Sequence, residues 1–253
     1  SISAEQAFTL LDIQRVTLEK LNVEYIGADT RSHYFSLLAL TAQSPADQLF
    51  KLSLNGAVEK EFPYQLDFTG GKLSDLATDK PWPIAFTLTF LSSTLAVSGS
   101  LRGGSGEVTF GLGTENLQEF ERLLQTKLPD AGASGIAGNV AFAPRRVAIT
   151  NLTGAMGKTT LIGALDFDAT GAKPKLSGSL ALPTLDLRPF LGEKPAQGNI
   201  EPPRSLAELY RSLSVTTFDF RKLNNVDADI TLGVGRWLSL PGDAKDVTLQ
   251  IKL

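Results

Sequence analysis

Apolar and polar side chains alternate strictly along the stretch Phe86-Thr87-Leu88-Thr89-Phe90. Successive side chains of a β-strand point to opposite faces, so this alternation predicts a strand with one apolar and one polar face. A polar second face is typical of an antiparallel sheet that has water on one side. The stretch therefore favours antiparallel β structure and disfavours a parallel α/β architecture.

The same period of two recurs on both sides of this stretch. Polar or small residues stand between the apolar ones, as Gln65 and Asp67 do. Alternation over nearly the whole chain predicts a mainly β protein. The apolar members of the other alternating segments are Val16 and Leu18; Phe50, Leu52 and Leu54; Tyr64, Leu66 and Phe68; Val147 and Ile149; Ile230, Leu232 and Val234; and Val247, Leu249 and Ile251.

Three segments change to a helical period, and each begins with a residue that can cap the free backbone N–H groups of a helix start. Ser3 to Gln6 and Ser205 to Glu208 both match the capping box. Thr114 is expected to cap the third segment. We therefore expect a few short helices packed on the sheet. The apolar stripe of the third one is Leu117, Phe120, Leu123 and Leu124.

Composition excludes several classes of function. The chain has 253 residues, of which 42% are hydrophobic and 20% charged, which is typical of a globular protein with a sizeable core. Its formal charge is −3 and its longest basic block is Arg145-Arg146, so nucleic acid is a poor partner. The absence of cysteine excludes disulfides, thiolate catalysis and cysteine-based metal sites. The longest apolar stretch, at 37–40, is far shorter than the roughly 20 residues that span a bilayer.

A pentapeptide of the form apolar-x-Gly-x-apolar occurs five times, which indicates a repeated strand unit. Within a strand its glycine falls on the same face as the flanking apolar residues and removes a side chain from the middle of that face. Two interpretations remain open: the glycine relieves crowding in a closed sandwich core, or repeated gaps let the sheet curl around a ligand. The copies are Leu54-Asn55-Gly56-Ala57-Val58, Val97-Ser98-Gly99-Ser100-Leu101, Ile136-Ala137-Gly138-Asn139-Val140, Leu161-Ile162-Gly163-Ala164-Leu165 and Leu176-Ser177-Gly178-Ser179-Leu180.

The run from Ala148 to Leu191 resembles the characteristic repeat of the AsmA-like proteins of Gram-negative bacteria. Its matching parts are Asn151-Leu152-Thr153-Gly154, Gly157, the stretch from Leu161 to Asp168, Pro174, Leu176-Ser177-Gly178-Ser179-Leu180, and Leu185-Asp186-Leu187-Arg188-Pro189-Phe190-Leu191. Ile13 to Tyr25 resembles the strand that introduces a repeat, and Leu223 to Leu253 the start of the next one. The resemblance covers nearly the whole chain. It implies an AsmA-like repeat region at 1–191, a loop at 192–203 and the start of a further repeat at 204–253.

The resemblance implies an elongated, strongly curved antiparallel β-sheet that is built from repeats and forms an open groove lined with apolar side chains. It further implies a periplasmic location, with an inner-membrane anchor outside this chain, and a role in outer-membrane biogenesis and phospholipid transport. The family has no catalytic motif to carry over. We therefore expect neither enzyme activity nor a cofactor.

In such a groove an acyl chain would lose its contact with water, at about 0.8 kcal/mol for each buried methylene. A smooth apolar surface would also let the chain slide. An alternative is a structural or assembly module that recruits envelope proteins through exposed edge strands without binding lipid. The two hypotheses differ in whether the apolar face is open. The residues expected to bind lipid are Phe86, Leu88, Phe90, Val97, Leu161, Leu165, Phe167, Leu176, Leu180 and Leu182.

Other patterns that suggest chemistry have simpler explanations. Gly157-Lys158-Thr159 is similar to a phosphate loop, but Leu152 stands where the first glycine belongs and a strand pattern follows. His33 is the only histidine, so a surface or packing role is expected, and a hydrolase built around it is the enzyme alternative. The acidic pairs are expected on a solvated strand face, without metal. These pairs are Asp166 with Asp168 and Asp227 with Asp229.

Overall fold

A computed structural model describes residues 14–26, 32–45, 48–190, 226–238 and 245–252. These residues are mainly β, as the alternation predicts. The chain divides into two compact units, Ser1–Leu112 and Gly113–Leu253. Among the described residues, no helix is long and apolar enough to cross a membrane.

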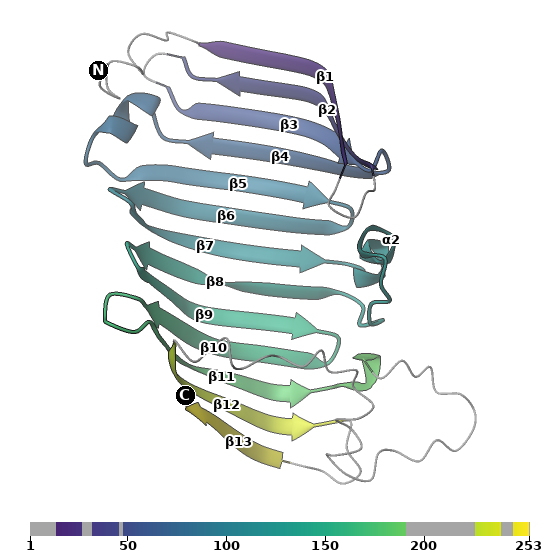
Figure 1. Ribbon diagram of the computed structural model, residues 1–253, viewed down its shortest axis with the longest axis vertical. Coiled ribbons are helices and arrows are strands. Elements are labelled where there is room, and N and C mark those ends of the chain that lie inside the picture. Colours follow the sequence, from purple (N-terminus) through teal and green to yellow (C-terminus); the bar gives the residue numbers. More distant parts are fainter. Residues whose placement is uncertain (1–13, 27–31, 46–47, 191–225, 239–244, 253) are drawn as a thin grey trace. The chain divides into compact units, whose positions relative to one another are not determined.

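In the first unit the strands are hydrogen-bonded in the order in which they occur in the chain (Figure 1). Neighbouring strands from β1 to β6 are antiparallel. A short 3-10 turn, η1 (Leu73–Ala77), connects β4 to β5. The strands are β1 (Arg15–Ile26), β2 (Ser32–Gln43), β3 (Phe50–Val58), β4 (Phe62–Gly70), β5 (Trp82–Phe90), β6 (Ser93–Arg102) and β7 (Ser105–Thr114), the last of which ends just beyond the unit.

The second unit also follows chain order, but one of its strand pairs is parallel. β11 and β12 run in the same direction, which corrects the expectation of a purely antiparallel sheet. Parallel strands need a crossover connection of a dozen or more residues, and the long segment between Leu185 and Asp227 provides that length. The strands are β8 (Ser134–Ala143), β9 (Arg146–Met156), β10 (Thr159–Asp168), β11 (Lys175–Leu185), β12 (Asp227–Trp237) and β13 (Lys245–Lys252).

Among the strands that the structure describes, the order is open, because β1 and β13 each have a hydrogen-bonded neighbour on one side only. The described residues also lack a closed core. None of their large side chains is fully buried, whereas the inner faces of a sandwich interdigitate into such a core. The apolar residues that come closest to burial, at 5–9% exposed, are Leu37, Phe62, Trp82, Ala131, Leu152, Ala228 and Val234.

Of the three predicted helices, the described residues contain one. Helical turns η2 (Leu117–Phe120) and α2 (Glu121–Leu124) lie where the third apolar stripe predicted them. The cap is Asn116 and not Thr114: the Asn116 Oδ1 accepts a hydrogen bond from the Gln118 N–H, at 2.9 Å. Thr114 is the last residue of β7, so the first free N–H groups come after it. The segments at 3–6 and 205–208, and the predicted loop at 192–203, lie outside the described residues.

Cross-strand register divides the first unit into an apolar and a polar face, since directly paired residues point to the same side. Six leucines, each paired with the next, form a row across β1 to β6, which we call the leucine row. A polar row runs next to it on the opposite face: Thr17, Thr41, Ser53, Asp67 and Thr87. The leucine row consists of Leu18, Leu40, Leu54, Leu66, Leu88 and Leu95.

Candidate functional site: the two apolar faces

Four of the residues predicted to bind lipid lie together on the apolar face of the first unit. Phe86, Leu88 and Phe90 alternate along β5, and Val97 of β6 is paired with Phe86. All four are half-buried. On the other side, β4 supplies partners that match in type: Tyr64 pairs with Phe90, Leu66 with Leu88, and Phe68 with Phe86.

Two aromatic rings of β4 are held by their neighbours. The Tyr64 hydroxyl donates a hydrogen bond to the Ser36 carbonyl at 3.1 Å, and its ring stacks on Phe35 at 5.4 Å. Burial raises the pKa of the Tyr64 phenol. Phe68 lies 5.8 Å from the ring of Phe50 and 6.1 Å from that of Trp82. Both rings therefore have a defined place, and the Tyr64 ring lies over Gly56, where a Cβ would be 2.5 Å from its hydroxyl oxygen.

Trp82 closes one end of this face. Only 8% of it is exposed, and its Nε1–H donates to the Lys72 carbonyl at 2.9 Å. The ring covers Gly70 and Gly71: a Cβ on Gly70 would lie 2.3 Å from the indole Cη2. Gly70 and Gly71 thus provide the space that the indole needs.

The other six predicted residues lie together on one face of the second unit. Leu161, Leu165 and Phe167 belong to β10, and Leu176, Leu180 and Leu182 to β11. Phe167 pairs with Leu176, which places both strands' apolar residues on the same side. Phe167 is 36% exposed, and the other five are half-buried. The ten predicted residues thus form two sets, one in each unit.

The repeated glycines mark close approaches between neighbouring strands, and four of the five copies show this directly. A Cβ on Gly163 would lie 2.3 Å from the Ser179 carbonyl oxygen, a distance that a side chain cannot occupy unless the backbone shifts. The neighbouring strands therefore approach closely at this glycine. The corresponding Cβ-to-oxygen distances are 1.9 Å from Gly56 to Ser36, 2.0 Å from Gly99 to Glu107 and 2.3 Å from Gly178 to Ala164.

The apolar face of the first unit extends to its edge strand, where exposure is highest. Every residue of β1 is exposed. Val16, Leu18, Leu21 and Val23 are each 41–44% exposed, and Tyr25 is 56% exposed. None of the residues predicted to bind lipid belongs to β1. The alternation at Val16 and Leu18 indicated an apolar strand face. Only the strand register shows that this face is continuous with the apolar residues of β5.

Phe86 and Val97 also line a hollow on β4 to β7, with a volume of about 480 Å³. Its other lining residues are mainly small or polar, among them Asp67, Thr69 and Ser98. Ser53 and Gln65 donate hydrogen bonds to Asp67 and lower the pKa of its carboxyl group. The hollow therefore has a different chemistry from the apolar face.

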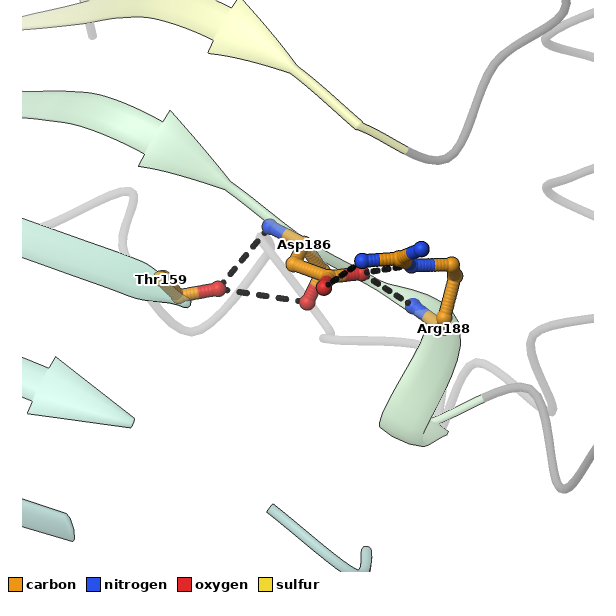
Figure 2. A network of polar contacts seen from close by, with 3 residues as sticks. All are labelled: Thr159, Asp186 and Arg188. Carbon is orange, nitrogen blue, oxygen red and sulfur yellow. Dashed lines mark hydrogen bonds and ion pairs between the residues drawn. The ribbon is translucent and has the colours of Figure 1, made fainter. Parts of the chain in front are cut away.

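A polar network of Thr159, Asp186 and Arg188 joins the end of β11 to the start of β10 (Figure 2). The Asp186 carboxylate accepts hydrogen bonds from the Arg188 backbone N–H at 3.1 Å and from its Nε at 2.8 Å, and also from Nη2. The Asp186 backbone N–H donates to the Thr159 Oγ1 at 2.9 Å. The Arg188 guanidinium lowers the pKa of Asp186, whose side chain is 6% exposed. These hydrogen bonds connect the residues that follow β11 to the first residue of β10.

The residues that suggested chemistry have structural partners. The His33 Nδ1 lies 2.8 Å from the Glu59 Oε1, and its ring stacks on Tyr25 at 5.1 Å. Gly157 and Lys158 form the turn between β9 and β10, where the strand pattern had argued against a phosphate loop. Asp166 pairs with Arg146 at 3.0 Å. Within the described part of the chain, no group of three or more His, Asp or Glu side chains is placed to hold a metal ion.

Comparison with known proteins adds no relative, because the chain matches no family model, no curated protein and no solved structure. The candidate site therefore rests on the geometry of the two apolar faces. Their side chains are large, uncharged and incompletely buried, and an apolar ligand is the chemistry that they fit.

Proposed function

We propose that this chain is a periplasmic segment of an AsmA-like protein of Gram-negative bacteria, and that its apolar β faces bind or conduct phospholipid for outer-membrane biogenesis. The proposal includes a strongly curved, repeat-built sheet that forms an open groove, and an inner-membrane anchor outside this chain. One observation carries it: the described residues present two apolar faces on which no large side chain is fully buried.

Burial of hydrocarbon provides the affinity. An acyl chain that removes ten methylenes from water gains about 8 kcal/mol before the loss of its own freedom is counted, at about 0.8 kcal/mol each. The leucine row offers the same contact on six successive strands. Equal neighbouring contacts give a bound chain little preference for one position, which is the condition for sliding. No covalent step is involved.

The test is native mass spectrometry of the chain purified from Gram-negative cells, followed by extraction and identification of lipid. Leu165→Asp with Leu180→Asp places charge on the apolar face of β10 and β11. The matched control is Ala164→Asp with Ser179→Asp, because these two residues are paired on the opposite face of the same strands. We expect co-purified phospholipid in the wild type and the control but not in the Leu165/Leu180 variant.

Circular dichroism and urea unfolding check that the variants fold. A folded wild-type chain without lipid would contradict the proposal. Equal loss of lipid in both double variants would show that the apolar face is not the binding surface.

The second candidate function is a structural or assembly module that recruits envelope proteins through its edges. Every residue of β1 is exposed, and within the described part of the chain β1 pairs with β2 alone, which favours this function. It predicts that Leu18→Lys with Val23→Lys abolishes capture of a protein partner in cross-linked cell envelopes. Two results would contradict this second function. They are lipid that co-purifies with the wild type, and capture of the protein partner by the variant with Leu18→Lys and Val23→Lys.

A further inference from the structure

A second hollow of the first unit lies where β2 ends, β3 begins and the chain leaves β4. Its volume is about 360 Å³, within the range of pockets that hold small molecules. We call it the lysine hollow. It contains none of the residues predicted to bind lipid. The described residues that line it are Gln43, Pro45, Gln48, Leu49, Lys51 and Lys72.

Hydrogen bonds hold the backbone on two sides of the lysine hollow. The Gln48 N–H donates to the Pro45 carbonyl at 3.1 Å, which fixes these two lining residues relative to each other. The Lys72 carbonyl accepts a hydrogen bond from the Nε1–H of Trp82 at 2.9 Å. Because the indole is only 8% exposed, it is a firm support. The lining residues therefore have a defined frame before any ligand binds.

The polar side chains of the lysine hollow supply positive charge and hydrogen-bond donors. Lys51 and Lys72 each contribute an ammonium group. Gln43 and Gln48 each contribute an amide, whose NH₂ group donates. Register pairs Gln43 with Lys51 on one side and with Arg15 on the other, so three polar side chains share one face. Among the described lining residues none is Asp or Glu. This chemistry favours an anion.

An acidic side chain of the same face, Asp67, is engaged elsewhere. It follows two residues before Thr69, the partner of Lys51 on β4. Its carboxylate accepts hydrogen bonds from Ser53 and Gln65, each at 2.7 Å. Asp67 does not line the lysine hollow. It therefore does not take the place of an anionic ligand there.

The amount of charge selects the kind of anion. A carboxylate or a phosphate diester carries a single negative charge, whereas a phosphate monoester carries about −1.5 to −2 at pH 7 and three strong acceptor oxygens. Two ammonium groups and two amides match the monoester better. The remaining lining residues, Pro45 and Leu49, are apolar and offer contact to a short carbon chain attached to the phosphate.

We propose that the lysine hollow binds a phosphate monoester, with Lys51 and Lys72 as its charge partners and Gln43 and Gln48 as further donors. The site is separate from the apolar faces, so this inference goes beyond the proposed function and does not depend on it. A soluble phosphate ester and the headgroup of phosphatidic acid share the required chemistry.

Titration calorimetry of the whole chain with glycerol 3-phosphate tests the site. We expect saturable binding that is about tenfold weaker in Lys51→Gln and in Lys72→Gln, because each variant loses a charge-assisted hydrogen bond. Lys51→Arg, which keeps the charge, should bind nearly as the wild type does. Glycerol alone should not bind. The matched control is Lys60→Gln, which removes the same charge in the turn beyond the opposite end of β3 and should leave binding unchanged.

Flotation with phosphatidylcholine vesicles, with and without phosphatidic acid, distinguishes the two sources of the phosphate. Flotation that requires phosphatidic acid and is lost in Lys51→Gln would assign the site to a lipid headgroup. Binding of glycerol 3-phosphate without flotation would assign it to a soluble ester. Binding of neither probe, or equal weakening in Lys60→Gln and Lys51→Gln, would overturn the inference.

Discussion

Leu165 of β10 lies directly across from Gly178 of β11, with its Cδ2 atom 2.9 Å from the place that a Cβ on that glycine would occupy. The relationship is reciprocal, since Leu180 faces Gly163 and its Cδ2 lies 2.8 Å from the corresponding place. Each leucine thus fills the space that the opposite glycine leaves open. The arrangement resembles the covering of strand glycines by large cross-strand side chains.

Gly178→Ala is expected to lower the free energy of unfolding by about 1–3 kcal/mol, the usual effect of overpacking. The added Cβ would lie 2.3 Å from the Ala164 carbonyl oxygen, so the strands must separate. Urea unfolding measures the change. Gly233→Ala in β12 is the control: nothing lies within 4 Å of its Cβ position, so we expect no loss of stability there. Equal effects at both positions would refute the close approach.

Asp186→Asn is expected to destabilise the fold by about 1–3 kcal/mol at pH 7, because the carboxylate accepts charge-assisted hydrogen bonds from Arg188. The pKa of Asp186 is lowered in the folded state, so its contribution is complete above the unfolded value of about 4. That contribution is lost as pH falls through the folded pKa. The difference between wild type and variant should therefore shrink from pH 7 to pH 2.

The control for this prediction is Asp227→Asn. Asp227 is 3.8 Å from Lys173, and both side chains are more than half exposed, so we expect a change below about 0.5 kcal/mol. Urea unfolding curves at pH 7, 4 and 2 give the unfolding free energies of the wild type and of both variants. A gap between wild type and Asp186→Asn that stays constant with pH would contradict the role of the carboxylate.

Tyr64→Phe is expected to cost about 1 kcal/mol at pH 8, because the hydrogen bond to the Ser36 carbonyl is lost. Burial raises the pKa of Tyr64, so the unfolded chain releases this proton first as pH rises above about 10. Wild-type stability should then fall toward that of the variant. Unfolding at pH 8 and pH 11 measures this. If the difference in unfolding free energy between the wild type and Tyr64→Phe grew from pH 8 to pH 11, the prediction would be wrong.

Trp82→Ala is expected to destabilise the first unit by about 3–5 kcal/mol, as large-to-small changes of well-buried aromatic residues do. The indole is 8% exposed, covers Gly70 and donates to the Lys72 carbonyl. Leu76→Ala is the control, because Leu76 is 46% exposed and should change stability by less than about 1 kcal/mol. Circular dichroism during urea unfolding follows both variants. Similar effects would mean that Trp82 does not anchor this face.

The strands could be predicted from the amino-acid sequence, because alternation with a period of two is a local property of the chain. Phe86 to Phe90 is in β5 as expected, and the Gly163 and Gly178 pentapeptides mark real close approaches. The helix cap was predicted at Thr114, because the sequence pattern does not show that β7 continues through that residue. The parallel pairing of β11 with β12 was not predicted, because it depends on contacts between residues that are far apart in the sequence.

Within each regular stretch of strand, the amino-acid sequence alone determines which side chains share a face, because alternation leaves each residue one of two sides. Only the tertiary structure decided which residues of different strands become neighbours. Register aligns Leu66 with Leu88 and Tyr64 with Phe90, and an irregularity between Leu37 and Ala39 changes the pairing on β2. A shift of the pairing by one residue would move the side chains of a strand to the opposite face. The leucine row therefore depends on the register that the turns and bulges between these strands set.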